Sequence, residues 1–178
     1  MKRIVFISGK GGTGKSTITA TLSRIVPNKL LADCDVDAAN LHLLLPGETL
    51  EEQIFYGAEE AVIDPALCTG CGNCKETCRF GAIDSNFRVD SALCEGCGAC
   101  TLVCAPEAVT LRPVRTGEIS VARTAHGTFT HAQLDPGAEG SGKLVTQVKK
   151  TLEKYEGEED WVLIDGAPGI GCVVISSI

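Results

Sequence analysis

The sequence predicts an α/β protein with a mostly parallel sheet, into which a small cysteine-rich α+β domain is inserted. Three observations support this prediction. A glycine-rich turn follows an N-terminal apolar run, a second apolar run near the C-terminus ends in an acid, and a cysteine pattern occurs twice between them. The first two features are typical of the sheet edge at which α/β proteins bind ligands.

The glycine-rich turn has the residues of a P-loop. An apolar run at residues 4–7 precedes it and a helix-compatible segment at about 15–25 follows it. The residues that fill G-x-x-x-x-G-K-[ST] are Gly9, Gly14, Lys15 and Ser16. Glycines let backbone N–H groups converge on phosphate oxygens, and the helix N-terminus adds partial positive charge. We therefore expect Lys15 to reach the β- and γ-phosphates and Ser16 to bind Mg²⁺.

Acidic residues follow two further predicted strands. Residues 30–32 predict a strand that runs into Asp33 and Asp35, and residues 161–164 predict a buried strand that ends at Asp165. The second pattern is that of a Walker B strand, whose acid meets the Mg²⁺ shell. A carboxylate pair at the end of the first strand lies where α/β sheets bind ligands. The alternative is an acidic loop that caps a helix starting near Asn40.

Eight of the ten cysteines form two copies of one pattern between residues 59 and 112. Each copy has the spacing x₂, x₂, x₃, which is that of bacterial ferredoxins with two clusters. In that pattern the fourth cysteine of each copy ligates the other cluster. The expected ligands of one 4Fe–4S cluster are Cys68, Cys71, Cys74 and Cys104, and those of the other are Cys94, Cys97, Cys100 and Cys78. In such ferredoxins a proline often follows the fourth cysteine directly. Here Arg79 follows Cys78, and Ala105 stands between Cys104 and Pro106.

Zinc sites and disulfides are the alternatives for these cysteines. Zinc favours two C-x₂-C pairs set well apart, and it gives no reason for three consecutive short spacings that occur twice. Disulfide scaffolds belong to small secreted chains, whereas an intracellular chain with this many cysteines points to metal.

Composition narrows the function classes. The chain has 178 residues, of which 44% are apolar, so it can form a packed core. Its net charge of −7 disfavours sequence-independent binding of nucleic acid. We see no signal peptide and no apolar run of membrane length, so we expect a cytoplasmic protein without a transmembrane segment.

The remaining elements complete the predicted order. A strand is expected at 53–56, two alternating strands at 118–122 and 127–132, a helix at 141–155 capped by Ser141, and a short helix near 172–178. The expected domains are residues 1–58 and 113–178 for the α/β part and 59–112 for the insertion. Cys34 and Cys172 are expected to be packed residues.

The segment Lys10–Thr17 resembles the deviant Walker A motif of the MinD/ParA/Mrp ATPases, a superfamily that includes the nitrogenase iron protein. The chain resembles those members that contain an inserted ferredoxin domain. The resemblance implies an ATP-dependent homodimer or paired paralogue, in which Lys10 reaches the partner's nucleotide. It assigns nucleotide binding to Gly9, Lys10, Gly11, Gly12, Thr13, Gly14, Lys15, Ser16 and Thr17.

The same resemblance assigns roles to the acids. Asp33 and Asp165, with Ser16, would hold Mg²⁺ directly or through water, and Asp35 would orient or activate the attacking water. Lys10, Lys15 and Asp35 are therefore the expected catalytic residues, while Asp37 stands where many members have glycine. Residues 166–169 resemble the segment that senses the γ-phosphate. The family's sheet continues further, so we expect the chain to cover about the first two thirds of the usual fold. A bridging-cluster role for Cys172, like that in the nitrogenase iron protein, is the alternative to packing.

Three functions compete at this point. The first is ATP hydrolysis coupled to electron transfer through two 4Fe–4S clusters to a redox partner protein. The second is ATP-dependent iron–sulfur cluster assembly or carriage of the Mrp type, and the third is a MinD/ParA-like positioning ATPase with structural clusters. Eight ligands that hold two permanent clusters favour electron transfer, because such clusters are poor candidates for delivery.

Overall fold

The computed structural model describes residues 1–178, which fall into two compact units. The sheet unit consists of Met1–Phe55 and Thr116–Ile178, and the cysteine unit consists of Tyr56–Arg115. These divisions lie three residues from those expected at 58/59 and 112/113. Two long strands, β3 (Gly47–Ile63) and β4 (Val109–Thr124), cross the divisions.

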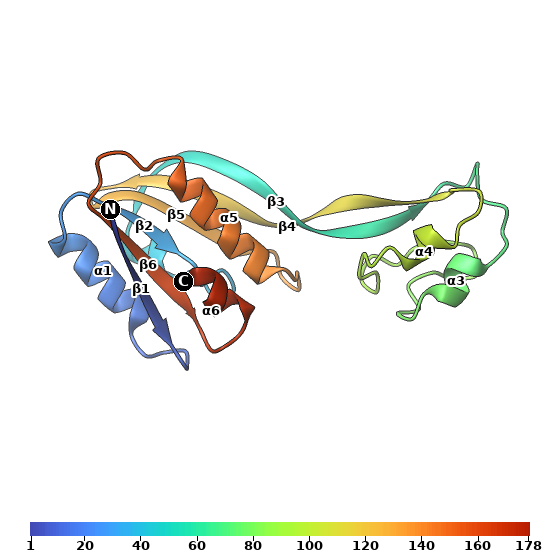
Figure 1. The fold of residues 1–178 in the computed structure, drawn as a ribbon, viewed down its shortest axis with the longest axis horizontal. Helices are drawn as coiled ribbons and strands as arrows, with labels where there is room; N and C mark the ends of the chain where they lie inside the picture. The colour runs from blue at the N-terminus through green and yellow to red at the C-terminus, as the bar shows by residue number, and fades with distance from the viewer. The chain divides into compact units, whose positions relative to one another are not determined.

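The six strands form one mixed sheet in the order β1-β6-β2-β5-β4-β3 (Figure 1). β1 (Lys2–Ser8), β6 (Trp161–Pro168), β2 (Lys29–Asp33) and β5 (Gly127–Leu134) pair in parallel. β4 pairs with β5 in the antiparallel sense, because only two residues separate the strands and a short turn reverses the chain. The parallel part of the sheet is thus as expected, next to an antiparallel hairpin.

Helices cover both faces of the parallel strands. α1 (Lys15–Ile25) and α2 (Leu41–Leu44) pack on one face, around Leu31, Phe129 and Leu163. α5 (Ser141–Glu153) packs on the other face, against Leu30 and Ile164, and α6 (Cys172–Ser177) packs against α5. All five residues of β2 are buried, as a strand covered on both faces requires.

Four local predictions need correction. Cys172, expected to be packed, is exposed. The strand expected to end at Asp165 continues to Pro168, because β6 stays paired with β1 as far as Ser8. The strand expected at 53–56 is part of the 17-residue β3, because backbone pairing with β4 extends it through the acidic residues that obscure the pattern. The helix expected from Ser141 begins there, but Gly140 is its N-cap, with a φ of 103° and no side-chain capping bond. Glycine adopts this left-handed conformation without the steric cost that serine would have.

The cysteine unit contains two short helices, α3 (Asn73–Thr77) and α4 (Ala99–Leu102), and a bridge between Ile83 and Val89. Its two halves repeat the same backbone contacts. The carbonyl of Asp64 accepts a bond from Cys68 N–H, and that of Asp90 accepts one from Cys94 N–H. No helix in either unit is long and apolar enough to cross a membrane.

Candidate functional site

The predicted P-loop connects β1 to α1, and α1 begins at Lys15 as expected. Gly12 and Gly14 have positive φ angles of 72° and 89°, which glycine adopts readily. A Cβ atom added at Gly9, Gly11, Gly12 or Gly14 would meet nothing within 4 Å. Packing within the protein therefore does not explain Gly9 and Gly11, whereas close approach of a ligand to the backbone does.

Two buried carboxylates lie beside this loop. Asp33, the last residue of β2, is the register partner of Asp165, which lies within β6. Asp33 accepts bonds from the N–H groups of Asp35 and Leu41, at 3.0 and 3.1 Å. The Thr19 hydroxyl lies 3.4 Å from Asp165 Oδ1, while Asp165 Oδ2 is buried without a hydrogen-bond partner.

Burial dominates the electrostatics of these acids. It raises the pKa of Asp33 to about 7, with the Asp165 charge acting in the same direction and the Asp35 N–H opposing it. Burial also raises the pKa of Asp165, against the hydroxyl of Ser16 and the charge of Lys15. An orphaned buried carboxylate oxygen near a hydroxyl and a second carboxylate fits a hard cation such as Mg²⁺, which takes oxygen ligands.

The other predicted nucleotide-site residues lie further out. Asp35 is half-buried, and burial raises its pKa while the Lys15 charge lowers it. Lys10 and Thr13 are exposed on the loop, and Thr17 is exposed in the first turn of α1. The loop after β6 is tied to the P-loop strand, because Gly169 N–H donates to the Ser8 carbonyl at 2.8 Å.

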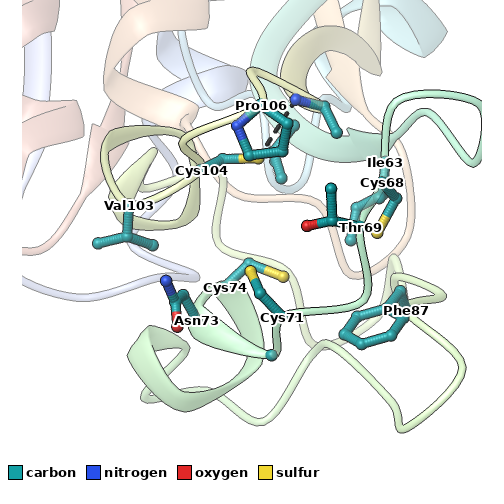
Figure 2. A pocket seen from close by; sticks show the side chains of 13 residues that line it. Ile63, Cys68, Thr69, Cys71, Asn73, Cys74, Phe87, Val103, Cys104 and Pro106 are labelled. Atoms are coloured by element: carbon teal, nitrogen blue, oxygen red, sulfur yellow. Dashed lines mark hydrogen bonds between the residues drawn. The ribbon is translucent and has the colours of Figure 1, made fainter.

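The eight repeated cysteines line two separate cavities. The first contains Cys68, Cys71, Cys74 and Cys104, whose sulfur atoms surround a common space (Figure 2). The second contains Cys78, Cys94, Cys97 and Cys100. The empty volumes are similar, about 300 and 350 Å³. Each cavity thus receives three cysteines from one repeat and the fourth from the other.

Backbone N–H groups point at several of these sulfur atoms. Ala108 N–H donates to Cys104 Sγ at 3.2 Å, and Ala61 N–H donates to Cys94 Sγ at 3.4 Å. Burial raises the pKa of Cys74 and of Cys100, with backbone N–H groups opposing it in both cases. Such donors stabilise a thiolate, which is the form that binds metal.

No group of three or more His, Cys, Asp or Glu side chains in residues 1–178 converges closely enough to hold a single metal ion. All ten cysteines are free thiols. The disulfide scaffold left open by the sequence is therefore not formed. Four thiols spread around one cavity suit a larger inorganic group.

Sequence reasoning missed several contributors to these sites. Thr19 was missed although its spacing of four residues from Lys15 places it on the same face of α1. The Leu41 N–H that bonds to Asp33 and the Ala61 and Ala108 N–H groups are backbone donors. Every residue except proline has a backbone N–H group, so the residue type does not predict which of these groups will act as donors.

Comparison with known proteins agrees with the geometry of the P-loop. Residues 4–167 match the family model of the CobQ/CobB/MinD/ParA nucleotide binding domain. The chain is 37% identical to an uncharacterized protein of Methanocaldococcus jannaschii, in an alignment of 181 positions that covers 99% of this chain and 63% of the relative. It is 43% identical over 77 residues to the septum site-determining protein MinD of Synechocystis, which covers 38% of this chain and 28% of that protein.

Among solved structures, the chain is similar to MinD of Pyrococcus horikoshii complexed with Mg-ADP, with a TM-score of 0.48 and 22% identity. The cell division ATPase MinD of Pyrococcus furiosus gives a TM-score of 0.45 and 20% identity. Each match covers 99% of this chain and 54% of the other. The chain thus spans less than two thirds of the length of these relatives. Because the family model matches most of the chain, the protein belongs to the CobQ/CobB/MinD/ParA nucleotide-binding domain family.

Proposed function

We propose that this protein couples ATP hydrolysis by a MinD-like dimer to electron transfer through two 4Fe–4S clusters. The observation that supports the clusters is the membership of the two cysteine cavities, each of which draws its fourth cysteine from the other repeat. This crossing is the ligand arrangement of two-cluster ferredoxins. It brings together thiols that are up to 36 positions apart in the chain, as from Cys68 to Cys104.

Bound at these cavities, the clusters would supply one-electron redox chemistry. The protein's own groups would hold them and tune them. The cysteine thiolates would be the ligands, and the Ala61 and Ala108 N–H groups would offset negative charge on Cys94 and Cys104. Free thiols throughout the chain accord with a reducing compartment, which supports a cytoplasmic location.

The residues around the P-loop support binding and hydrolysis of Mg·ATP. Residues 9–17 would surround the phosphates, with Lys15 neutralising the charge that develops at the β- and γ-oxygens. Ser16, Asp165 and Asp33 would hold Mg²⁺ directly or through water. Asp35 would orient the attacking water and accept its proton as the bond between the γ-phosphorus and the bridging oxygen breaks. Its raised pKa makes it a stronger base than an exposed aspartate.

Exposure of Lys10 supports a role outside its own chain. Its side chain is exposed, whereas Lys15 is buried against the carboxylates. In the proposed dimer, Lys10 would contact the nucleotide of the second copy, and closure would depend on ATP. A redox partner protein would exchange electrons with the cysteine unit.

One other function has an observation in its favour. The 43% identity to a septum site-determining MinD over 77 residues favours a positioning ATPase in which the clusters are structural.

Replacing Asp33 by Asn should change the pH dependence of stability in the nucleotide-free protein. Because the folded-state pKa of Asp33 is raised to about 7, its contribution is present below the ordinary aspartate pKa and is lost as the pH rises through 7. Between pH 5 and 8 the wild type should therefore lose about 2–3 kcal/mol relative to Asp33→Asn. Denaturant unfolding, followed by the fluorescence of the single tryptophan, Trp161, measures this difference.

Asp37→Asn, at an exposed carboxylate on the same loop, is the control and should keep the wild-type pH dependence. Mg·ADP should reduce the loss in the wild type, because a bound cation stabilises the ionised carboxylate. Equal pH slopes in wild type and Asp33→Asn would contradict the assignment.

Lys15→Ala and Asp35→Ala should separate binding from hydrolysis. Lys15→Ala removes a charge-assisted hydrogen bond to phosphate and should weaken ATP binding about tenfold to a hundredfold. Asp35→Ala should leave binding largely intact and stop phosphate release, because its role concerns the attacking water. Calorimetry and a phosphate-release assay measure the two effects, and an equal loss of binding in both variants would show that Asp35 is misassigned.

Anaerobically prepared or reconstituted protein should carry about eight iron atoms per chain, as two cubanes require. Cys71→Ala and Cys97→Ala, at equivalent exposed positions, should each reduce this to about four. Cys34→Ala is the control, because this buried cysteine packs in the apolar core of the sheet unit and should not affect the iron content. Zinc in place of iron, or iron loss in the control, would refute the ligand sets.

Coupling of the two sites is tested with nucleotide and a redox readout. A ligand that shifts a redox equilibrium must bind the two redox states with different affinity. Mg·ATP should therefore change a cluster's potential, its spectrum or its rate of oxidation by a partner. Lys10→Ala should weaken that response while sparing ATP binding by the monomer. If cluster-replete protein with its partner shows no nucleotide effect, the positioning ATPase is the better reading.

A further inference from the structure

The two cysteine cavities are built from equivalent positions of an internal repeat, so the side chains that differ between them are informative. Thr69 and Glu95 each follow the first cysteine of their repeat, and Asn73 and Ala99 each precede the third. Thr69 and Asn73 line the cavity of Cys68, Cys71, Cys74 and Cys104. Glu95 and Ala99 line the cavity of Cys78, Cys94, Cys97 and Cys100. We name these the Thr69 site and the Glu95 site.

The two sites are alike in the exposure of their cysteines and in backbone hydrogen bonding to sulfur. Cys71 and Cys97 are both exposed, Cys74 and Cys100 are both buried, and the other four cysteines are half-buried. At each site one cysteine sulfur accepts a bond from an alanine N–H, Ala108 at the Thr69 site and Ala61 at the Glu95 site. Burial and backbone bonding therefore do not distinguish the sites, and the wall side chains do.

The residues that line the two cavities differ in charge and in hydrogen-bond donors. Glu95, which is exposed and directly follows the cysteine Cys94, is the one charged residue that lines either cavity. At the equivalent position the Thr69 hydroxyl projects into the space between the sulfur atoms (Figure 2). Reduction adds one negative charge to a cluster, which a nearby carboxylate disfavours and a hydroxyl or amide donor favours.

We propose that Glu95 gives its site the lower reduction potential, so that a singly reduced protein holds its electron at the Thr69 site. This inference rests on the proposed binding of two clusters. One electron supplied by a one-electron donor protein to the Glu95 site would pass to the Thr69 site. The first site is then oxidised and the second reduced, with no proton transferred and no bond broken.

Two cationic side chains lie near the cavities, and one of them, Arg79, stacks on Phe80, which lines the Glu95 site. The Arg79 guanidinium lies 4.7 Å from the centre of the Phe80 ring, and Lys75 Nζ donates to Ser85 Oγ at 2.8 Å. Neither residue lines a cavity, and neither does Glu107. Arg79 nevertheless adjoins Cys78, a ligand of the Glu95 site, so its charge opposes that of Glu95 and requires its own variant.

Each potential can be measured in isolation in the full chain. Cys97→Ala leaves only the Thr69 site able to hold its complete ligand set, and Cys71→Ala leaves only the Glu95 site. Anaerobic redox titration with dithionite and mediators, followed by electron paramagnetic resonance, gives the midpoint potential of each. The Glu95 site should be the lower of the two, and in otherwise wild-type protein the Thr69 signal should develop first.

Because residues 69 and 95 occupy equivalent positions of the repeat, substitutions at these positions test the role of Glu95. Glu95→Gln, which keeps the side-chain volume, should raise the lower potential and leave the other potential unchanged. At a fixed solution potential, the ratio of reduced to oxidised cluster at the Glu95 site should increase about threefold to tenfold. A tenfold change corresponds to 59 mV for a one-electron couple. The double exchange Thr69→Glu with Glu95→Thr should reverse the order of reduction. An iron content of about eight confirms that both sites have formed in each variant.

The outcomes separate this inference from the proposed function. Two clusters with equal potentials, an unchanged potential in Glu95→Gln, or a larger shift in Arg79→Ala than in Glu95→Gln would overturn the inference and leave the clusters in place. Wild-type protein that binds no clusters would overturn both.

Discussion

The sheet unit depends on two buried carboxylates that meet at one edge. Asp33 and Asp165 are register partners on adjacent parallel strands, so parallel pairing brings like charges together away from water. Burial and mutual repulsion raise the pKa of Asp33, and the neighbouring groups limit that cost. The N–H groups of Asp35 and Leu41 satisfy Asp33, and Thr19 and Lys15 lie by Asp165. A bound cation would relieve the remaining repulsion, which links fold and proposed ligand.

The hydrophobic core of the cysteine unit is small. Its buried apolar cluster contains five residues, two of which are the cysteines Cys74 and Cys100. A domain of this size seldom folds stably on hydrophobic burial alone without disulfides or metal. All of its cysteines are free thiols, so disulfides do not stabilise it. Binding of clusters would therefore stabilise the unit as well as give it redox chemistry.

Two strands connect the sheet unit, with its carboxylates, to the cysteine unit. The cysteine unit is inserted between α2 and β5, and β3 and β4 are the segments that continue from one unit into the other. α2 begins at the residue whose N–H bonds to Asp33. The chain segment whose N–H satisfies Asp33 therefore continues directly into β3. This connectivity gives the proposed coupling between nucleotide and clusters a covalent path.

Elements with a local sequence signal could be predicted without the structure. The bounds of α1, the start of β6 at Trp161 and the two cysteine repeats all follow from spacing within short segments, because these patterns depend on neighbours along the chain. The continuation of β6 beyond Asp165 does not, because it depends on pairing with β1. Tertiary structure alone decided that Asp33 stands opposite Asp165, that β3 extends over 17 residues, and that backbone N–H groups of Ala61 and Ala108 reach cysteine sulfur atoms. Each of these depends on strand register or on a backbone donor, neither of which any residue type encodes. The raised pKa values of the acids have the same origin, because burial is a property of the packed sheet and not of the aspartate.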